Sequence, residues 1–371
     1  MRDIVKLTIE KNQLIKSLTL VSKGMSSRTT LPILSSIYLE AYKGTLTFRT
    51  SDLEISIQHT TDALIEKEGA TVVPGKLFSD IVKSLPDAAV ILEQDKDNLT
   101  IKSLDTKFVV HTLNPSDFPL FPEVDVLSAV TVPSKTISDM VKKVAKAVSR
   151  DESRAVLTGI LLKIEQDTIQ MVATDSYRVA ISKSGLEDTT EASFDLIVPG
   201  SVLDEIGRLV VGEEKVIISD SQNQIIFDFG KTTFITRKIE GTYPNYEAII
   251  PTEKSISATV ETSSLLTAVK RIAITAQSHS PVRFLLDPPT QTIEISSSTQ
   301  DVASSIERVG AQIDGEELAI GFNHQYILDG LSVIDTEEVL FEAQTSQKPG
   351  ILKTIGESYF FYLTMPVRID K

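Results

Sequence analysis

Several features that support common protein chemistries are missing from this chain of 371 residues. It contains no cysteine, which excludes disulfide bonds and thiolate nucleophiles. No apolar run approaches the roughly 18 residues that a membrane-spanning helix needs. The first residues, MRDIVKLTIEKNQL, lack the apolar core and the small-residue cleavage site of a secretory signal peptide. We therefore expect a cytoplasmic protein that has no membrane partner.

The motifs of common enzyme classes are missing as well. The sequence has no GxxxxGK[ST] phosphate-binding loop, no GxGxxG in the context of a strand and a helix, and no GxSxG nucleophile elbow. No histidine lies at metal-ligand spacing from another histidine or a carboxylate pair. The four histidines are His59, His111, His279 and His324. We expect no metal, no cofactor and no catalysis, although a metal site built from distant carboxylates stays open as the alternative.

The chain is long enough for two or three domains. Hydrophobic residues make up 41% and charged residues 24%, which is ordinary for a globular protein. The net charge of −14 argues at first sight against binding to nucleic acid, because phosphate contacts need lysine and arginine. A net charge is only a sum, however, and whether the chain can bind nucleic acid depends on how its charges are distributed.

One sequence pattern occurs three times. VVPGKLFSDIVKSLP (72–86) is repeated as IVPGSVLDEIGRLV (197–210), and more faintly as LAIGFNHQYILDGLSVI (318–334). Short alternating segments typical of β-strands follow each copy. Each copy is also preceded by a strand, a helix and further strands, and Asp52 and Asp175 fall at matching positions.

This repeat predicts three α+β modules of about 120 residues, each with two helices packed on antiparallel strands. We expect domains at 1–126, 127–252 and 253–371. The expected helices are 10–24, 75–86, 135–150, 200–212, 262–279 and 322–334. A triplication that only enlarges a structural protein is the simplest alternative.

Positive charge is concentrated on the expected helices. The six segments carry 13 lysine and arginine residues against six aspartate and glutamate residues, whereas the rest of the chain has a net charge of −21. If 135–150 is one helix, its basic residues fall within an arc of about 100°. They are Lys135, Lys142, Lys143, Lys146 and Arg150. The pattern favours a basic face that contacts phosphates without reading sequence, although a salt-bridged surface helix is an alternative for this helix alone.

Five stretches resemble one family, the bacterial DNA polymerase III beta subunit, which is the replicative sliding clamp. They are SSRTTLPILSSI (26–37), ATDSYRVA (173–180), GTYPNYEAIIP (241–251), IGFNHQYILDGL (320–331) and YLTMPVRI (362–369). The resemblance covers the whole chain. It implies a non-catalytic processivity factor with three clamp domains per chain. Two chains would pair head to tail into a six-domain ring whose helices surround duplex DNA.

The resemblance also implies partners and contact residues. A clamp loader would place the ring on DNA, and the DNA polymerase III catalytic subunit, other polymerases and repair proteins would bind it through short linear motifs. The implied DNA contacts are Arg28, Lys76, Lys83, Lys142, Lys143, Lys146, Arg150 and Arg154. The segment RDESRAV (150–156) lacks an aromatic pair that some members direct toward DNA, so only charge contact is expected there.

A pocket for partner peptides is implied between the second and third modules, beside the C-terminal tail. Its expected residues are Leu157, Thr174, Tyr177, Arg178, Val179, Pro244, Ile249, Leu363, Met365, Pro366, Val367 and Arg368. Aliphatic side chains, a flexible methionine and two arginines suit short peptides with apolar anchors. Taken singly, these residues would also fit core packing, and 363–369 would fit a frayed chain end. Ala248 replaces an arginine found in some members, which would loosen polar anchoring.

The dimer seam is the last implied site. Phe108 and Val110 match the apolar patch of the first domain, and Ile274 matches that of the third. Lys107 would meet an acid such as Glu307 across the seam. An ordinary core position is the alternative for Phe108. A triplicated scaffold that does not bind DNA would leave the basic helices unexplained.

Overall fold

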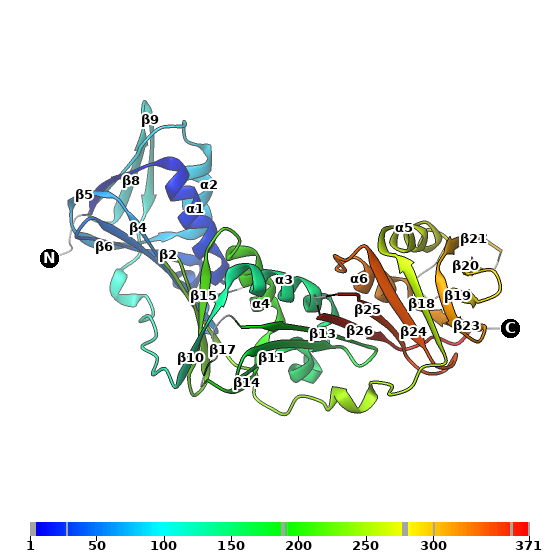
Figure 1. Cartoon of the computed structure of the whole chain (residues 1–371). Coiled ribbons are helices and arrows are strands. Elements are labelled where there is room, and N and C mark those ends of the chain that lie inside the picture. Colours follow the sequence, from blue (N-terminus) through cyan, green and yellow to red (C-terminus); the bar gives the residue numbers. More distant parts are fainter. Residues whose placement is uncertain are drawn as a thin grey trace. The chain divides into compact units, whose positions relative to one another are not determined.

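The computed structural model describes residues 5–26, 29–186, 190, 192–276, 281–299, 301–356 and 359–369 (Figure 1). The chain divides into two compact units, residues 1–135 with 208–238 and residues 136–207 with 239–371. The helices in the described ranges are α1 (Lys11–Val21), α2 (Gly75–Ser84), α3 (Ser134–Val144), α4 (Gly200–Leu209), α5 (Thr262–Ala273) and α6 (His324–Leu331). None of these helices is long and apolar enough to cross a membrane.

The first unit contains two antiparallel sheets. The five-stranded sheet has the order β5 (Leu64–Lys67), β1 (Lys6–Ile9), β7 (Val90–Asp95), β8 (Asn98–Ser103) and β9 (Thr106–His111). The eight-stranded sheet has the order β10 (Ser128–Pro133), β15 (Lys215–Asp220), β16 (Gln224–Phe229), β17 (Thr232–Arg237), β4 (Ile55–Asp62), β3 (Thr45–Ser51), β2 (Ser36–Tyr42) and β6 (Gly69–Pro74). Helices α1 and α2 lie side by side in this unit (Figure 1).

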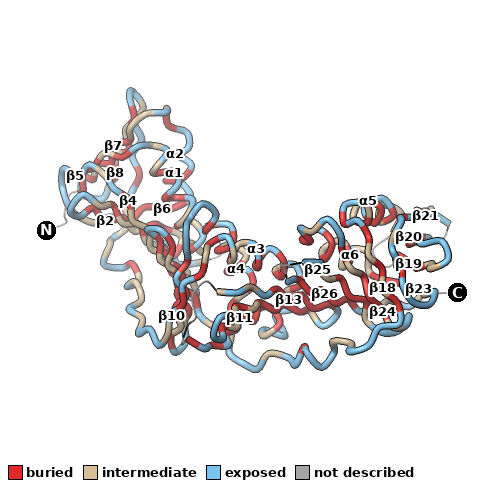
Figure 2. Tube along the Cα trace, viewed as in Figure 1, coloured by how far each residue is buried: buried red, intermediate tan, exposed pale blue. Residues whose placement is uncertain are grey.

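The second unit also contains two antiparallel sheets. The nine-stranded sheet has the order β14 (Phe194–Pro199), β11 (Gly159–Glu165), β12 (Thr168–Thr174), β13 (Arg178–Gly185), β26 (Tyr359–Thr364), β25 (Gly350–Thr354), β24 (Glu338–Ala343), β18 (Ile256–Glu261) and β22 (Gln312–Gly315). The four-stranded sheet has the order β21 (Ala303–Gly310), β20 (Thr292–Thr299), β19 (Val282–Asp287) and β23 (Leu318–Phe322). Most residues of β13, β26 and β24 are buried (Figure 2).

The repeated Val-Pro-Gly pattern marks the same strand-to-helix step in two places. Strand β6 ends at Pro74 and α2 begins at Gly75, while β14 ends at Pro199 and α4 begins at Gly200. A Cβ atom on Gly75 would lie 2.1 Å from the sulfur of Met25, so the methionine side chain packs closely against this glycine. The expected helix starts at residues 75 and 200 are confirmed.

The matching aspartates form the same turn. Asp52 Oδ1 accepts hydrogen bonds from the backbone N–H groups of Glu54 and Ile55 at 3.0 and 2.7 Å. Asp175 Oδ1 accepts from those of Tyr177 and Arg178 at 2.9 and 3.1 Å. The first turn connects β3 to β4 and the second connects β12 to β13. The repeat detected in the sequence therefore extends to individual hydrogen bonds.

All six α-helices are shorter than the expected segments, and two of them show this most clearly. The segment 135–150 is helical only as far as Val144, because 145–147 tighten into a 3₁₀ turn and Val148 is extended. The segment 262–279 ends its α-helix at Ala273. The single continuous basic face predicted for 135–150 is consequently wrong, since Lys146 and Arg150 lie beyond the α-helix.

The expected modules share their sheets. Strand β4 pairs with β17 in the first unit, and β13 pairs with β26 in the second. Each pair joins strands from two neighbouring expected modules, so each large sheet runs through a module boundary. The two compact units therefore do not follow the three expected ranges, and the boundaries at 126 and 252 stay a prediction.

Candidate functional site

Several residues of the expected peptide pocket belong to the paired strands β13 and β26 or to segments next to them. Leu157, Thr174, Val179 and Leu363 are buried and are the candidate floor. Val179 and Leu363 are directly opposite each other in the two strands. Alternating strand positions put apolar side chains from neighbouring strands on one face of this sheet, where they form a local cluster. The pairing brings together expected pocket residues that are far apart along the chain.

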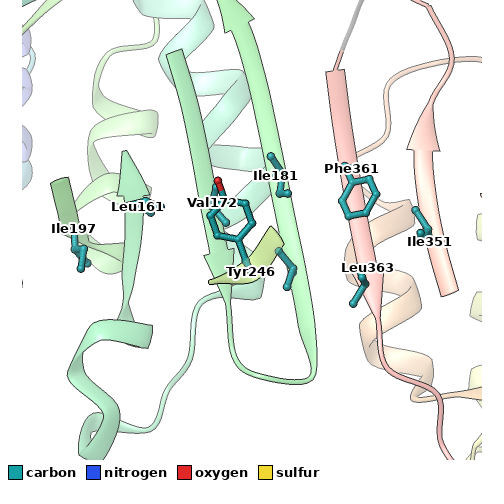
Figure 3. Packing of buried hydrophobic residues seen from close by; sticks show 9 residues of the cluster. Leu161, Val172, Ile181, Ile197, Tyr246, Ile351, Phe361 and Leu363 are labelled. Carbon is teal, nitrogen blue, oxygen red and sulfur yellow. The ribbon is translucent and has the colours of Figure 1, made fainter. Parts of the chain in front are cut away.

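An apolar row runs through the sheet beside this floor. Leu161, Val172, Ile181 and Phe361 are successive cross-strand partners on β11, β12, β13 and β26. Tyr246 packs against the same cluster (Figure 3). The hydroxyl of Tyr246 accepts a hydrogen bond of 2.7 Å from the amide of Gln170.

The matching row of the first unit is polar. There the successive cross-strand partners are Tyr38, Arg49, Gln58 and Thr233, on β2, β3, β4 and β17. The Nε of Arg49 donates to the side-chain oxygen of Gln58 at 2.7 Å. The two junctions thus share their backbone pattern but differ in the side chains on this face.

Exposed side chains form the expected rim of the pocket. Tyr177, Pro244, Ile249, Met365, Val367 and Arg368 are exposed, and Pro366 is half-buried. The backbone N–H of Met365 donates to the carbonyl of Tyr177 at 2.8 Å, and that of Val367 donates to the carbonyl of Gly321 at 2.8 Å. These bonds fix the tail, which disfavours the frayed-end interpretation of 363–369. Ala248 is exposed near this rim, in the same short helical turn as Ile249.

Two tyrosines stabilise the segments around the pocket. The hydroxyl of Tyr243 donates to the carbonyl of Val172 at 3.2 Å, and that of Tyr362 donates to the carbonyl of Tyr326 at 2.9 Å. Burial raises the pKa of both phenols, so both remain neutral donors. Each bond therefore connects a loop or helix to the sheet.

Arg178 differs from the expected peptide anchor. It is only 8% exposed, and its guanidinium pairs with Asp175 and Asp329 at 3.0 and 2.6 Å. Sequence reasoning missed Asp329 and Tyr362 as its partners. No local signal could have found them, because Asp329 is 151 positions away along the chain.

The first unit carries two of the expected DNA contacts on α2. Lys76 and Lys83 are exposed and line a cavity of about 960 Å³ between α1 and α2. Lys23, Thr19 and Met25 also line this cavity. The apolar side of α2 packs inward through Phe78, Ile81 and Val82, and leaves both lysines at the surface. Arg28, the other expected contact here, lies outside the described residues.

The second unit holds the remaining expected contacts. Lys142, Lys146, Arg150 and Arg154 are exposed. The ammonium of Lys146 donates to Ser332 Oγ at 2.7 Å. Arg154 pairs with Asp151 at 3.1 Å. Each of these four side chains keeps an exposed cation at the surface.

Lys143 corrects the expected basic stripe. It is 8% exposed and forms an ion pair of 3.3 Å with Asp335. Its charge is therefore buried and neutralised rather than presented on the surface. The residue points to the packed side of α3, whereas Lys142, the next residue back, is exposed.

The expected seam residues lie on an edge strand of one sheet and at the end of a helix. Strand β9 is the last of the five-stranded sheet, and β21 is the last of the four-stranded sheet. Phe108 on β9 is 36% exposed, whereas Val110 is 4% exposed and belongs to the core. Ile274, just after α5, is 84% exposed.

The expected partner of Lys107 is already engaged. Glu307 forms an ion pair with Arg271 of its own chain. The hydrogen bonds from Arg271 lower the pKa of Glu307, so the pair stays charged. A bond from Lys107 across the seam would have to compete with this pair.

Among the described residues, no group of three or more histidine or acidic side chains is arranged to hold a metal ion.

Sequence models of three domain families match the chain in order. They are the N-terminal, central and C-terminal domains of the DNA polymerase III beta subunit, matched at residues 5–122, 131–245 and 247–368. The beta sliding clamp of Bacillus subtilis is 31% identical over 376 residues, with 98% of this chain and 100% of the relative covered.

Solved structures agree in fold. A crystal structure of the DNA polymerase sliding clamp from Bacillus subtilis has a TM-score of 0.93 and 31% identity, covering 99% of this chain and 100% of that one. The sliding clamp of Pseudomonas aeruginosa bound to griselimycin has a TM-score of 0.93 and 27% identity, covering 98% and 100%.

Proposed function

This chain belongs to the DNA polymerase III beta subunit family, the beta sliding clamps, and we propose that it retains DNA by enclosing it within a ring of two chains. As a clamp it is a non-catalytic processivity factor with three clamp domains. The alternative of a phosphodiester-acting enzyme has no support from this family. The match of all three domains along the whole chain is the observation that carries the assignment.

The ring would hold duplex DNA without reading its sequence. Exposed lysines and arginines on α2, on α3 and in the segment after α3 would supply phosphate contacts. The proposed set is Lys76, Lys83, Lys142, Lys146, Arg150 and Arg154. Arg28 would join them, whereas Lys143, buried and paired with Asp335, would make no phosphate contact. Such contacts are weak and salt-dependent. Enclosure makes weak contacts sufficient, because the DNA cannot leave a closed ring sideways.

Two chains would meet head to tail, with Phe108 on β9 of one chain near Ile274 of the partner. Strands β9 and β21 end their sheets, so each has backbone groups available for pairing. Val110 supports Phe108 from the core side. A head-to-tail contact of this kind is heterologous, because it joins two different surfaces. It gives a closed ring only if the rotation that relates the two chains brings their free ends together.

The pocket at the β13–β26 junction would tether the partners. A buried apolar floor and an exposed rim with Met365 suit a short peptide that inserts apolar side chains. We propose the catalytic subunit of DNA polymerase III, the clamp loader, other polymerases and repair proteins as its users. Because replication takes place on the bacterial chromosome, we place the protein in the cytoplasm.

Retention on DNA should depend on the topology of the DNA. After loading onto a nicked circular plasmid by the clamp loader, the protein should elute with the DNA in gel filtration, even at raised salt. Cutting the plasmid once should release nearly all of it, because the ring can slide off an end. Plasmid left uncut is the control. Equal retention on cut and uncut plasmid would contradict enclosure.

The tail should contribute directly to peptide binding. Replacing Met365 and Arg368 with alanine should weaken binding of a clamp-binding peptide from the polymerase III catalytic subunit by about 10- to 100-fold. Fluorescence anisotropy measures the affinity, and light scattering should show an unchanged dimer. Leu120→Ala, at an exposed apolar residue outside the pocket, is the matched control. Unchanged affinity in the double variant would rule out the proposed pocket.

A further inference from the structure

We propose that Arg178 is a positioning residue that holds the rim of the pocket in its binding-ready shape without itself touching the ligand. This inference rests on the proposed pocket and concerns how its two sides are kept in register. An arginine in this position would ordinarily be taken as a polar anchor for a peptide. Its contacts indicate a different role.

Four of the five N–H donors of the Arg178 guanidinium are engaged by the protein. Its Nε donates to Asp175 at 3.0 Å, and Nη1 donates to Asp329 at 2.6 Å and to the hydroxyl of Tyr362 at 3.2 Å. Its Nη2 donates to the carbonyl of Lys146 at 2.5 Å. The group also lies over the ring of Tyr326, 4.4 Å from the ring centroid. All three nitrogens and one face of the group are occupied, which leaves little of it for a ligand.

Through Asp175, the contacts of Arg178 extend to both sides of the rim, which are the turn that carries Tyr177 and the tail that begins at Met365. One oxygen of Asp175 accepts from Arg178 Nε, while the other accepts from the backbone N–H groups of Tyr177 and Arg178. The carbonyl of Tyr177 in turn accepts from the backbone N–H of Met365. Arg178 therefore restrains the turn that carries Tyr177 and, through that turn, the start of the tail.

Arg178 also connects segments that are distant in sequence. Asp329 belongs to α6, Tyr362 to β26 and Lys146 to the 3₁₀ turn after α3. Two further contacts connect the end of α3 and the turn after it to the segment that follows α6. They are the Lys143–Asp335 ion pair and the hydrogen bond from Lys146 to Ser332. The carboxylates of Asp175 and Asp329 are each largely buried. Loss of Arg178 would leave both without their cation, and the turn would be free to adopt other arrangements.

Positioning and direct contact predict different kinetics. If a variant only lowers the fraction of molecules with a competent pocket, the apparent affinity falls by that fraction, through the association rate. The dissociation rate of the bound ligand then stays unchanged. Loss of a direct contact instead raises the dissociation rate. A general loss of stability, with the pocket intact in folded molecules, would alter neither rate.

The test uses griselimycin, which is bound to the sliding clamp of Pseudomonas aeruginosa in a solved structure. Surface plasmon resonance on the intact protein would compare Arg178→Met, Asp329→Asn and their double variant. Each single variant should lower the association rate by about tenfold and leave the dissociation rate within about twofold. The double variant should lower the association rate no further than the single variants do, because both substitutions break the same Arg178–Asp329 contact.

Tyr362→Phe provides a milder variant should Arg178→Met fail to fold. It removes one hydroxyl and keeps the buried ring, so its association rate should fall by about two- to threefold. Met365→Ala tests the pocket itself and should raise the dissociation rate. These two variants keep the proposal testable whatever the stability of the Arg178 variant.

Two patterns of results would overturn the inference while leaving the pocket in place. In the first, Arg178→Met raises the dissociation rate and Asp329→Asn has no effect, so Arg178 contacts the ligand. In the second, the Arg178, Asp329 and Tyr362 variants all bind normally while Met365→Ala binds weakly. If Met365→Ala is also unchanged, the pocket assignment fails, and the inference fails with it.

Discussion

Replacing Ile274 with glutamate should separate the two-chain ring into single chains and abolish retention on closed circular DNA. The side chain is 84% exposed in the single chain, so the substitution should not disturb folding. At the seam, however, the new carboxylate would be buried against an apolar patch without a partner. Such burial costs several kcal/mol, which is enough to dissociate a dimer at ordinary concentrations.

Light scattering over a dilution series measures this effect. The wild-type protein should have about twice the chain mass of 40.7 kDa, and the variant should have the mass of one chain. Leu64→Glu is the matched control, because Leu64 is 70% exposed on β5, the opposite edge of the sheet that ends in β9. That control should remain dimeric. A variant at Ile274 that stays dimeric at high dilution would remove this residue from the seam.

Replacing Phe341 with alanine should destabilise the C-terminal part of the chain by about 3–5 kcal/mol. Phe341 is buried between two other phenylalanines, with ring centroids 6.1 Å from Phe284 and 6.0 Å from Phe322. Removing the ring leaves a cavity that these rigid neighbours cannot fill, and it also removes the edge and stacking contacts.

Urea denaturation followed by circular dichroism would measure the loss as a lower unfolding midpoint. The exposed Ile355, just after β25, provides the comparison in the same part of the chain. Ile355→Ala should change the free energy of unfolding by no more than about 0.5 kcal/mol. Equal effects of the two substitutions would show that the three-ring cluster is not the stabilising core inferred from the structure.

Local features of this fold were predictable from the sequence, and long-range features were not. The steps from Pro74 to Gly75 and from Pro199 to Gly200 were predicted because proline and glycine act on their own backbone. The equivalence of Asp52 and Asp175 was detected from the repeat, and the turn that each residue forms is completed within four residues. The general α+β architecture followed from the repetition of such local signals.

The errors concern partners far away in the sequence. Lys143 fits an exposed stripe by helical periodicity, but Asp335 neutralises it from another part of the chain. Arg178 resembles a surface anchor until Asp329 is seen beside it. An amphipathic pattern also continues past Val144, although the α-helix ends there. Alternation in a strand shows which face is apolar but does not name the neighbouring strand, so the sheets shared between modules were missed.

The contrast between the two sheet junctions sets how many partners one chain can hold. The junction of β13 and β26 has the apolar row from Leu161 to Phe361, whereas the junction of β4 and β17 has Arg49 and Gln58 in the matching places. A peptide with apolar anchors would gain little at the second junction, where it would have to displace an existing hydrogen bond. We therefore expect one docking point per chain, and two rather than four in the proposed two-chain ring. With both points occupied, a third protein would gain access only after one occupant dissociates, so residence time would govern the order in which partners act.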